Sequence, residues 1–141
     1  MVERRVANDL AMLKLALVIL GGAIGTAARF GMVSAAQRWN PATPAGPVWP
    51  WGTFVVNLIG CFAIGYLATS FGGRWPIRDE WRAAILVGVL GGFTTFSSLA
   101  WEGLDMFQSG QPGKAAAYVI ASNTLGLGLA WVGAMTAKIA M

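Results

Sequence analysis

Histidine is absent from this 141-residue sequence, cysteine occurs once, and only six residues are acidic. Acid–base catalysis and metal-activated water both need clustered ionisable or metal-binding side chains. The two carboxylates expected inside a long hydrophobic segment, Glu102 and Asp105, have no such partners nearby in the sequence. We therefore predict that the chain is not an enzyme. The lone Cys61 excludes an internal disulfide and is expected to be a small packing residue.

Charge of both signs is scarce. Ten basic and six acidic residues are too few to cover a soluble domain of this size, and 56% of the residues are hydrophobic. No charged residue lies between Arg38 and Arg74, or between Lys114 and Lys138. A spanning helix needs about 20 apolar residues. The sequence thus predicts an all-α integral membrane protein, a single domain over residues 1–141, with four transmembrane helices at about 11–36, 51–71, 83–106 and 115–137.

Three polar or proline-containing segments separate these spans, at residues 41–47, 74–80 and 108–113. Basic residues are more frequent at the termini and in the second loop than on the opposite side, which favours cytoplasmic termini. The expected location is the cell's inner (plasma) membrane. A cleaved signal peptide is not expected, because the first apolar run is too long and contains Arg29. The basic residues are dispersed, so nucleic acid is not an expected partner.

A polar, glycine-containing segment interrupts the third span: Gly91-Gly92-Phe93-Thr94-Thr95-Phe96-Ser97-Ser98. Adjacent glycines and hydroxyl side chains weaken helical hydrogen bonding, and a bilayer tolerates irregular backbone only where protein or water covers it. We therefore predict a helix that is broken mid-membrane, with a binding or passage site at the break. The alternative is a kinked helix whose hydroxyls bond to its own carbonyls.

Other polar side chains recur at helical spacing inside the spans. Asn57 follows Thr53 by one turn in the second span, and Ser122 follows Tyr118 by one turn in the fourth. Interhelical hydrogen bonds are the alternative role for such residues. Arg29 is costly within a hydrophobic helix, so it is expected to face a wet cavity or a partner, unless its long side chain reaches the membrane surface.

Together these groups are donors and small dipoles without a row of fixed charges. Amide and hydroxyl hydrogens, with the positive edges of phenylalanine rings, can replace water around a small anion while still releasing it. Glycines at residues 21, 22, 25, 88, 91 and 92 allow helix backbones to approach closely. Four helices alone enclose little space, so we expect an oligomer.

The ordered motifs resemble the CrcB/Fluc family of fluoride channels: Gly22-x-x-Gly25 with Arg29, Trp51-Gly52-Thr53 leading to Asn57 and Gly60, and Gly88 through Ser98. The resemblance covers nearly the whole chain. It implies an antiparallel, dual-topology homodimer that passively exports fluoride along two pathways. It also implies a central structural sodium held by the main-chain carbonyls of Gly91 and Thr94. The resemblance, together with the polar interruption and the polar residues at helical spacing, places these residues on the fluoride pathway: Arg29, Thr53, Asn57, Thr95, Phe96, Ser97, Ser98, Glu102, Tyr118 and Ser122.

Three features depart from the family pattern. Leu99 stands where the family has a second phenylalanine, so Phe93 or Trp101 compensates or that aromatic contact is dispensable. Gly126 and Ala130 occupy the next positions of the hydroxyl track on the fourth helix. The bias of basic residues favours one orientation, so a separately encoded, oppositely oriented partner is the alternative to a homodimer.

Two other functions remain as alternatives. A small multidrug-type, proton-coupled exporter also has four short helices, but it should carry a buried carboxylate in its first helix, where this chain has none. A non-transporting membrane assembly subunit would explain the glycine faces, yet it leaves the Thr/Ser break unexplained.

Overall fold

The computed structural model describes residues 2–39, 48–73 and 75–140, and the regular structure in these ranges is helical. Four stretches are long and apolar enough to cross a membrane, which confirms an all-helical, multi-pass membrane protein. The elements are α1 (Val2–Trp39), α2 (Trp51–Gly72), α3 (Asp79–Ala83), the π-helical η1 (Ala84–Val89), α4 (Leu90–Phe93), α5 (Phe96–Gln108) and α6 (Pro112–Ile139).

The helix ends lie close to the predicted limits of the spans, except that α1 begins at Val2 rather than near Ala11. Pro112 stands in the first turn of α6, where its missing N–H has no helical partner to lose. Gly110, with φ of 77°, supplies the left-handed residue between α5 and α6. The predicted loop at 41–47, and Arg74 of the second loop, lie outside the described residues.

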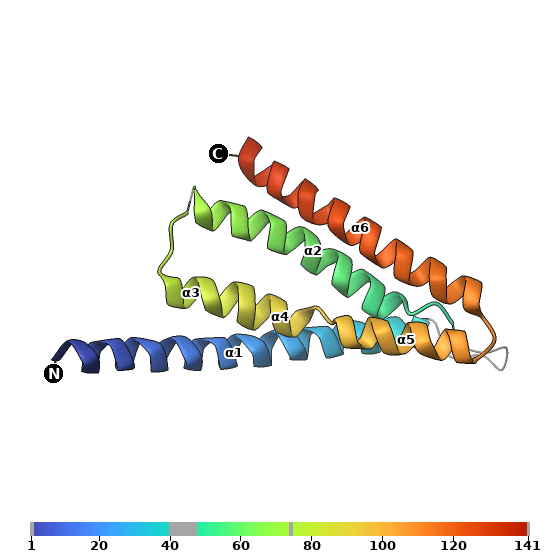
Figure 1. Cartoon of the computed structure of the whole chain (residues 1–141), viewed down its shortest axis with the longest axis horizontal. Coiled ribbons are helices and arrows are strands. Elements are labelled where there is room, and N and C mark those ends of the chain that lie inside the picture. Colours follow the sequence, from blue (N-terminus) through green and yellow to red (C-terminus); the bar gives the residue numbers. More distant parts are fainter. Residues whose placement is uncertain (1, 40–47, 74, 141) are drawn as a thin grey trace.

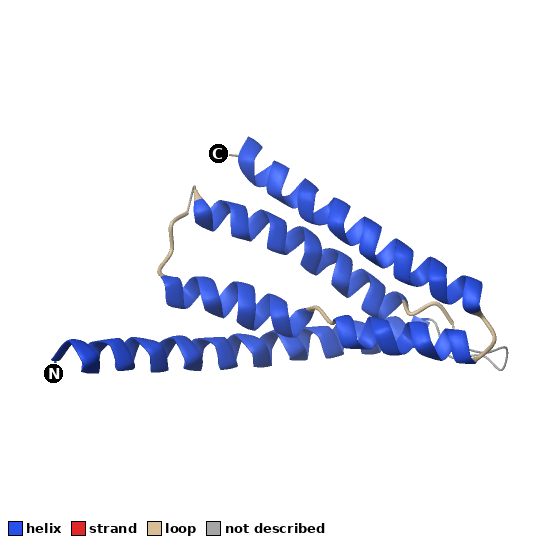
Figure 2. Cartoon of the chain, in the orientation of Figure 1, coloured by secondary structure: helices blue, strands red, loops and turns tan. Residues whose placement is uncertain are grey.

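The helices associate mainly as two pairs. α2 packs along α6, whereas α1 packs against α3, η1 and α4 (Figure 1). A short loop separates α4 from α5, as Figure 2 shows, and α5 then packs mainly against α6. Both ends of the chain and the α2–α3 connection lie at the same end of the bundle (Figure 1). The interruption therefore changes the packing partner of the third span from α1 to α6.

Glycines bring α1 and the third span into backbone contact. A Cβ atom on Gly92 would stand 2.6 Å from the carbonyl oxygen of Gly22. A Cβ atom on Gly25 would overlap the carbonyl oxygen of Val89. The close approach that the glycine spacing predicts is thus used within the chain. Gly91, in contrast, has open space beside it.

α2 and α6 also touch through their backbones, and the two helices run in the same direction (Figure 1). A Cβ atom on Gly65 would overlap the carbonyl oxygen of Ala130, and one on Gly133 would overlap that of Phe62. These contacts fix the register of the two helices. Residues one turn apart on α2 therefore face residues one turn apart on α6.

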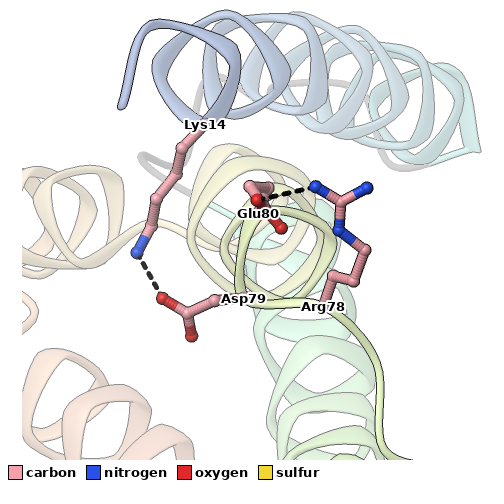
Figure 3. Close-up of polar contacts among 4 residues, drawn as sticks. All are labelled: Lys14, Arg78, Asp79 and Glu80. Atoms are coloured by element: carbon pink, nitrogen blue, oxygen red, sulfur yellow. Dashed lines mark hydrogen bonds and ion pairs between the residues drawn. The ribbon is translucent and has the colours of Figure 1, made fainter. Parts of the chain in front are cut away.

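Charged side chains gather where the second loop enters α3. Lys14 Nζ lies 2.8 Å from Asp79 Oδ2, and Arg78 Nη2 lies 3.0 Å from Glu80 Oε1 (Figure 3). Exposed pairs such as Lys14 and Asp79 contribute little stability. They do show that Lys14 is level with the start of α3, so the first turns of α1 extend past the other helices (Figure 1).

Candidate functional site

The third span is interrupted at Thr94 and Thr95, whose backbones are extended, with ψ of 156° and 121°. Asn57 on α2 holds this interruption. Its side-chain nitrogen donates to the Thr95 carbonyl (3.0 Å), and its side-chain oxygen accepts from the Thr95 N–H (2.8 Å). Thr95 Oγ1 accepts from the Ser98 N–H (3.2 Å) and so caps the first turn of α5. Side chains thus replace the helical bonds at this point.

These contacts redirect two donors that a continuous helix would use. The Thr95 N–H would reach back four residues to the Gly91 carbonyl, and the Ser98 N–H to the Thr94 carbonyl. Both bond to side-chain oxygens instead. The Thr94 hydroxyl does donate back to the Leu90 carbonyl (2.9 Å), which is the local bond of the kinked-helix alternative. The carbonyls of Gly91 and Thr94 are left without their helical donors.

A second polar cluster surrounds Glu102 of α5. The Thr53 hydroxyl donates to Oε1 (2.5 Å) and the Tyr118 hydroxyl donates to Oε2 (2.6 Å). Thr53 and Tyr118 are buried. The Trp49 ring packs edge-on against Tyr118, with centroids 5.4 Å apart, and also against Phe54, at 5.6 Å. Two hydroxyl hydrogens from different helices therefore converge on one pair of acceptor oxygens.

Two cavities, each of about 410 Å³, flank these polar groups. The break cavity lies beside the interruption, and its wall includes Asn57, Cys61, Thr95, Phe96 and Ser122. The end cavity lies toward the first residues of α2, and its wall includes Gln37, Trp49, Trp51, Thr53 and Glu102. Thr53 and Glu102 of the second cluster therefore border the end cavity, whereas Asn57, one turn after Thr53, borders the break cavity.

A row of polar side chains connects the cavities along the facing surfaces of α2 and α6. Thr53 and Tyr118 form one level through Glu102, and Asn57 and Ser122, each one turn further on, border the break cavity. The Ser122 side chain is buried, and its hydroxyl has no hydrogen-bond partner among the described residues. The hydroxyl oxygen itself is almost fully covered in the single chain.

Of the other residues predicted for the site, some lie at the interruption and one lies away from both cavities. Phe96 borders the break cavity and is 73% exposed in the single chain. The hydroxyls of Ser97 and Ser98 lie 3.1 and 3.2 Å from Thr95 Oγ1. Arg29 is half-buried on α1, borders neither of the two cavities and forms no ion pair with the described residues.

Sequence reasoning missed the structural roles of Trp49 and Cys61. Trp49 was not among the predicted site residues, but it packs on Tyr118 and borders the end cavity. Cys61 was expected to be a packing residue, and it borders the break cavity. Its spacing one turn after Asn57 was the available signal. Leu99 is buried and also borders the break cavity, which neither of its suggested substitutes touches.

The fold and the site define a class of protein. Apolar helices enclose a row of hydroxyl and amide groups, together with carbonyls that have lost their helical donors. Within the described ranges, no three histidine, cysteine or carboxylate side chains gather as a metal cluster. Polar groups held between spanning helices are typical of membrane proteins that bind or pass polar solutes. The chain is a multi-pass helical membrane protein with such a site.

Comparison with known proteins gives the family. Residues 16–134 match the family described as CrcB-like protein, Camphor Resistance (CrcB), and the chain belongs to this family. A relative from Methylobacillus flagellatus, named "Fluoride-specific ion channel FluC", is 40% identical over 92% of this chain and 98% of its own length. Relatives of the same name from Caulobacter vibrioides and Nitratidesulfovibrio vulgaris are 42% and 36% identical, over 90% and 91% of this chain and 97% and 99% of their own lengths.

The membership that the motifs predict is thereby confirmed. The named relatives are channels rather than enzymes, in agreement with the absence of a catalytic cluster in the sequence.

Proposed function

We propose that this chain is a fluoride-selective channel through which fluoride leaves the cytoplasm passively. The observation that carries the proposal is the row of polar side chains on α2 and α6, which connects the break cavity with the end cavity. Relatives that match nearly the whole chain bear the name of fluoride-specific channels. An exporter coupled to protons and an assembly subunit account for neither observation.

The chemistry of the row supports an anion as the permeating ion. The Thr53 and Tyr118 hydroxyls already direct their hydrogens at the carboxylate of Glu102, so their geometry suits a negatively charged acceptor. Ser122 adds a buried hydroxyl without a partner among the described residues. A hydroxyl has one hydrogen, so Thr53 and Tyr118 can replace the water around fluoride only by releasing Glu102, whereas Ser122 has no such partner among the described residues. Neither kind of donor has the lasting hold of a fixed positive charge. Arg29 then belongs at the aqueous mouth of the pathway.

We further propose that two copies pair antiparallel in the inner (plasma) membrane, giving a dual-topology homodimer with two pathways. The support is the open side of the break cavity, where Gly91 and Phe96 are exposed in the single chain. A second copy would cover this side and exclude lipid from the polar groups. A separately encoded, oppositely oriented partner remains the alternative, and a purified chain that stays monomeric in lipid would favour it.

One structural sodium ion is proposed at the centre of the dimer, held by the main-chain carbonyls of Gly91 and Thr94 from both copies. Carbonyl oxygens are ligands for hard cations. Both carbonyls have lost their helical donors, and Gly91 has open space beside it. The ion would join the two interruptions. Flame photometry of desalted protein should find one sodium per dimer, and a sodium content equal to that of the buffer would contradict the assignment.

Fluoride efflux from liposomes tests the proposed function. The purified protein is reconstituted into vesicles loaded with potassium fluoride, a potassium ionophore clamps the voltage, and an electrode follows the ion outside. We expect rapid fluoride release, and no faster chloride release than from protein-free vesicles in a parallel preparation. If the protein is shown to be dimeric and fluoride leaves these vesicles no faster than protein-free vesicles, the proposed channel function is rejected.

A further inference from the structure

α2 and α6 present a third level beyond the two polar levels already described. Gly126 lies one turn after Ser122 on α6 and offers no side chain, while Cys61 lies one turn after Asn57 on α2. A Cβ atom built on Gly126 would stand 3.2 Å from Cys61 Sγ. The thiol therefore occupies the space in front of position 126, where the hydroxyl track of α6 stops.

The surroundings of Cys61 differ from those of a packing residue. Its side chain is only half-buried, and it borders the break cavity together with Ser122. The Ser122 side chain is 8% exposed, and its hydroxyl has no partner among the described residues. A buried donor without a partner marks a place where a polar ligand is expected. Cys61 shares the wall of that place.

We propose that Cys61 is an additional lining residue of the fluoride pathway and that its S–H continues the donor row at the level of Gly126. This inference rests on the proposed function. A thiol is a weak donor and a polarizable group. It can contact fluoride at this level without binding it strongly, which conduction requires of each site. α2 thus supplies the polar hydrogen that α6 lacks there.

A thiol reagent tests this role, because Cys61 is the single cysteine of the chain. Dimeric protein in fluoride-loaded liposomes is treated with methyl methanethiosulfonate, and mass spectrometry verifies that the thiol is modified. Fluoride efflux should fall at least about tenfold, since the added methylthio group fills a path only wide enough for a small ion. Cys61→Ser should keep its own untreated rate when the reagent is added.

A cysteine elsewhere provides the matched control. Ile19 on α1 is 62% exposed and borders neither cavity. In the Cys61→Ser background, Ile19→Cys should conduct equally before and after treatment.

A second variant, Cys61→Val, keeps a similar side-chain volume but has no hydrogen-bond donor. Its fluoride efflux should be about fivefold slower than that of the unchanged protein, which is the loss expected for one hydrogen bond.

Three results would overturn the assignment of Cys61. These are full modification without slowing, no modification under conditions in which the unfolded chain reacts completely, and unchanged efflux in Cys61→Val. Each can occur while untreated protein still passes fluoride, so each separates this inference from the proposed function. If untreated dimeric protein passes no fluoride, the proposed function fails first and the role of Cys61 fails with it.

Discussion

Replacing Asn57 with alanine is expected to lower fluoride efflux by at least about thirtyfold while the protein still inserts and dimerises. The amide makes both bonds to the Thr95 backbone, so its removal leaves a backbone donor and a backbone acceptor unpaired beside the break cavity. Each such group costs about 1–3 kcal/mol, and about 1.4 kcal/mol in a barrier is tenfold in rate. Liposome efflux measures the loss.

Thr124→Ala is the matched control for Asn57→Ala. Thr124 is another polar residue of a span, but it is exposed and its hydroxyl donates to carbonyls of its own helix (2.8 Å to Ile120). We expect this variant to conduct like the unchanged protein. Asn57 would not have the proposed role at the interruption if Asn57→Ala conducted as well as Thr124→Ala, or if both variants lost activity to the same degree.

Replacing Gly25 with valine is expected to prevent correct folding. A Cβ atom at this position would overlap the carbonyl oxygen of Val89, which belongs to the backbone and has no rotamer by which to move away. Overpacking a tight core costs about 1–3 kcal/mol when side chains can shift, and here α1 must separate from η1. The expected result is aggregated protein after extraction, seen by size-exclusion chromatography.

Gly31→Val tests whether valine is harmful to α1 in general. Gly31 lies in the same helix, and among the described residues no atom outside its chain neighbours and its own helix backbone lies within 4 Å of where its Cβ would stand. This variant should elute like the unchanged protein and keep its fluoride efflux. A well-folded Gly25→Val would show that α1 and the third span do not pack as closely as the structure has them.

The number and position of the spans could be predicted from sequence because hydropathy alone decides them. The uncharged, largely apolar residues between Arg38 and Arg74 favour lipid over water, and a helix satisfies its own backbone hydrogen bonds there. The extension of α1 back to Val2 was not predicted. Hydropathy identifies the part of a helix that lies in the membrane and is silent about a charged helix that continues outside it.

The candidate residues of the site could be predicted individually, but their partners could not. The hydroxyl and glycine pattern indicated an interruption near Thr95, and Asn57 stood out as a polar residue within a span. Asn57 can bond to Thr95 only in one register between α2 and the third span. That register is set by many small packing contacts between the helices. For the same reason, the spacing of residues in the sequence did not predict that Thr53 and Tyr118 would both bond to Glu102.

The two bonds between Asn57 and Thr95 also fix the direction of the amide group. A backbone N–H and a backbone C=O cannot exchange roles, so turning the amide over would set oxygen against oxygen and hydrogen against hydrogen. One hydrogen of the amide nitrogen takes no part in these two bonds, and because Asn57 borders the break cavity, the amide dipole keeps one orientation beside that cavity. Hydroxyl groups such as Ser122 can rotate to meet either charge, whereas the Asn57 amide cannot turn over. The sign of charge that Asn57 favours beside it would therefore be set by the main chain, through a side chain that it does not allow to turn.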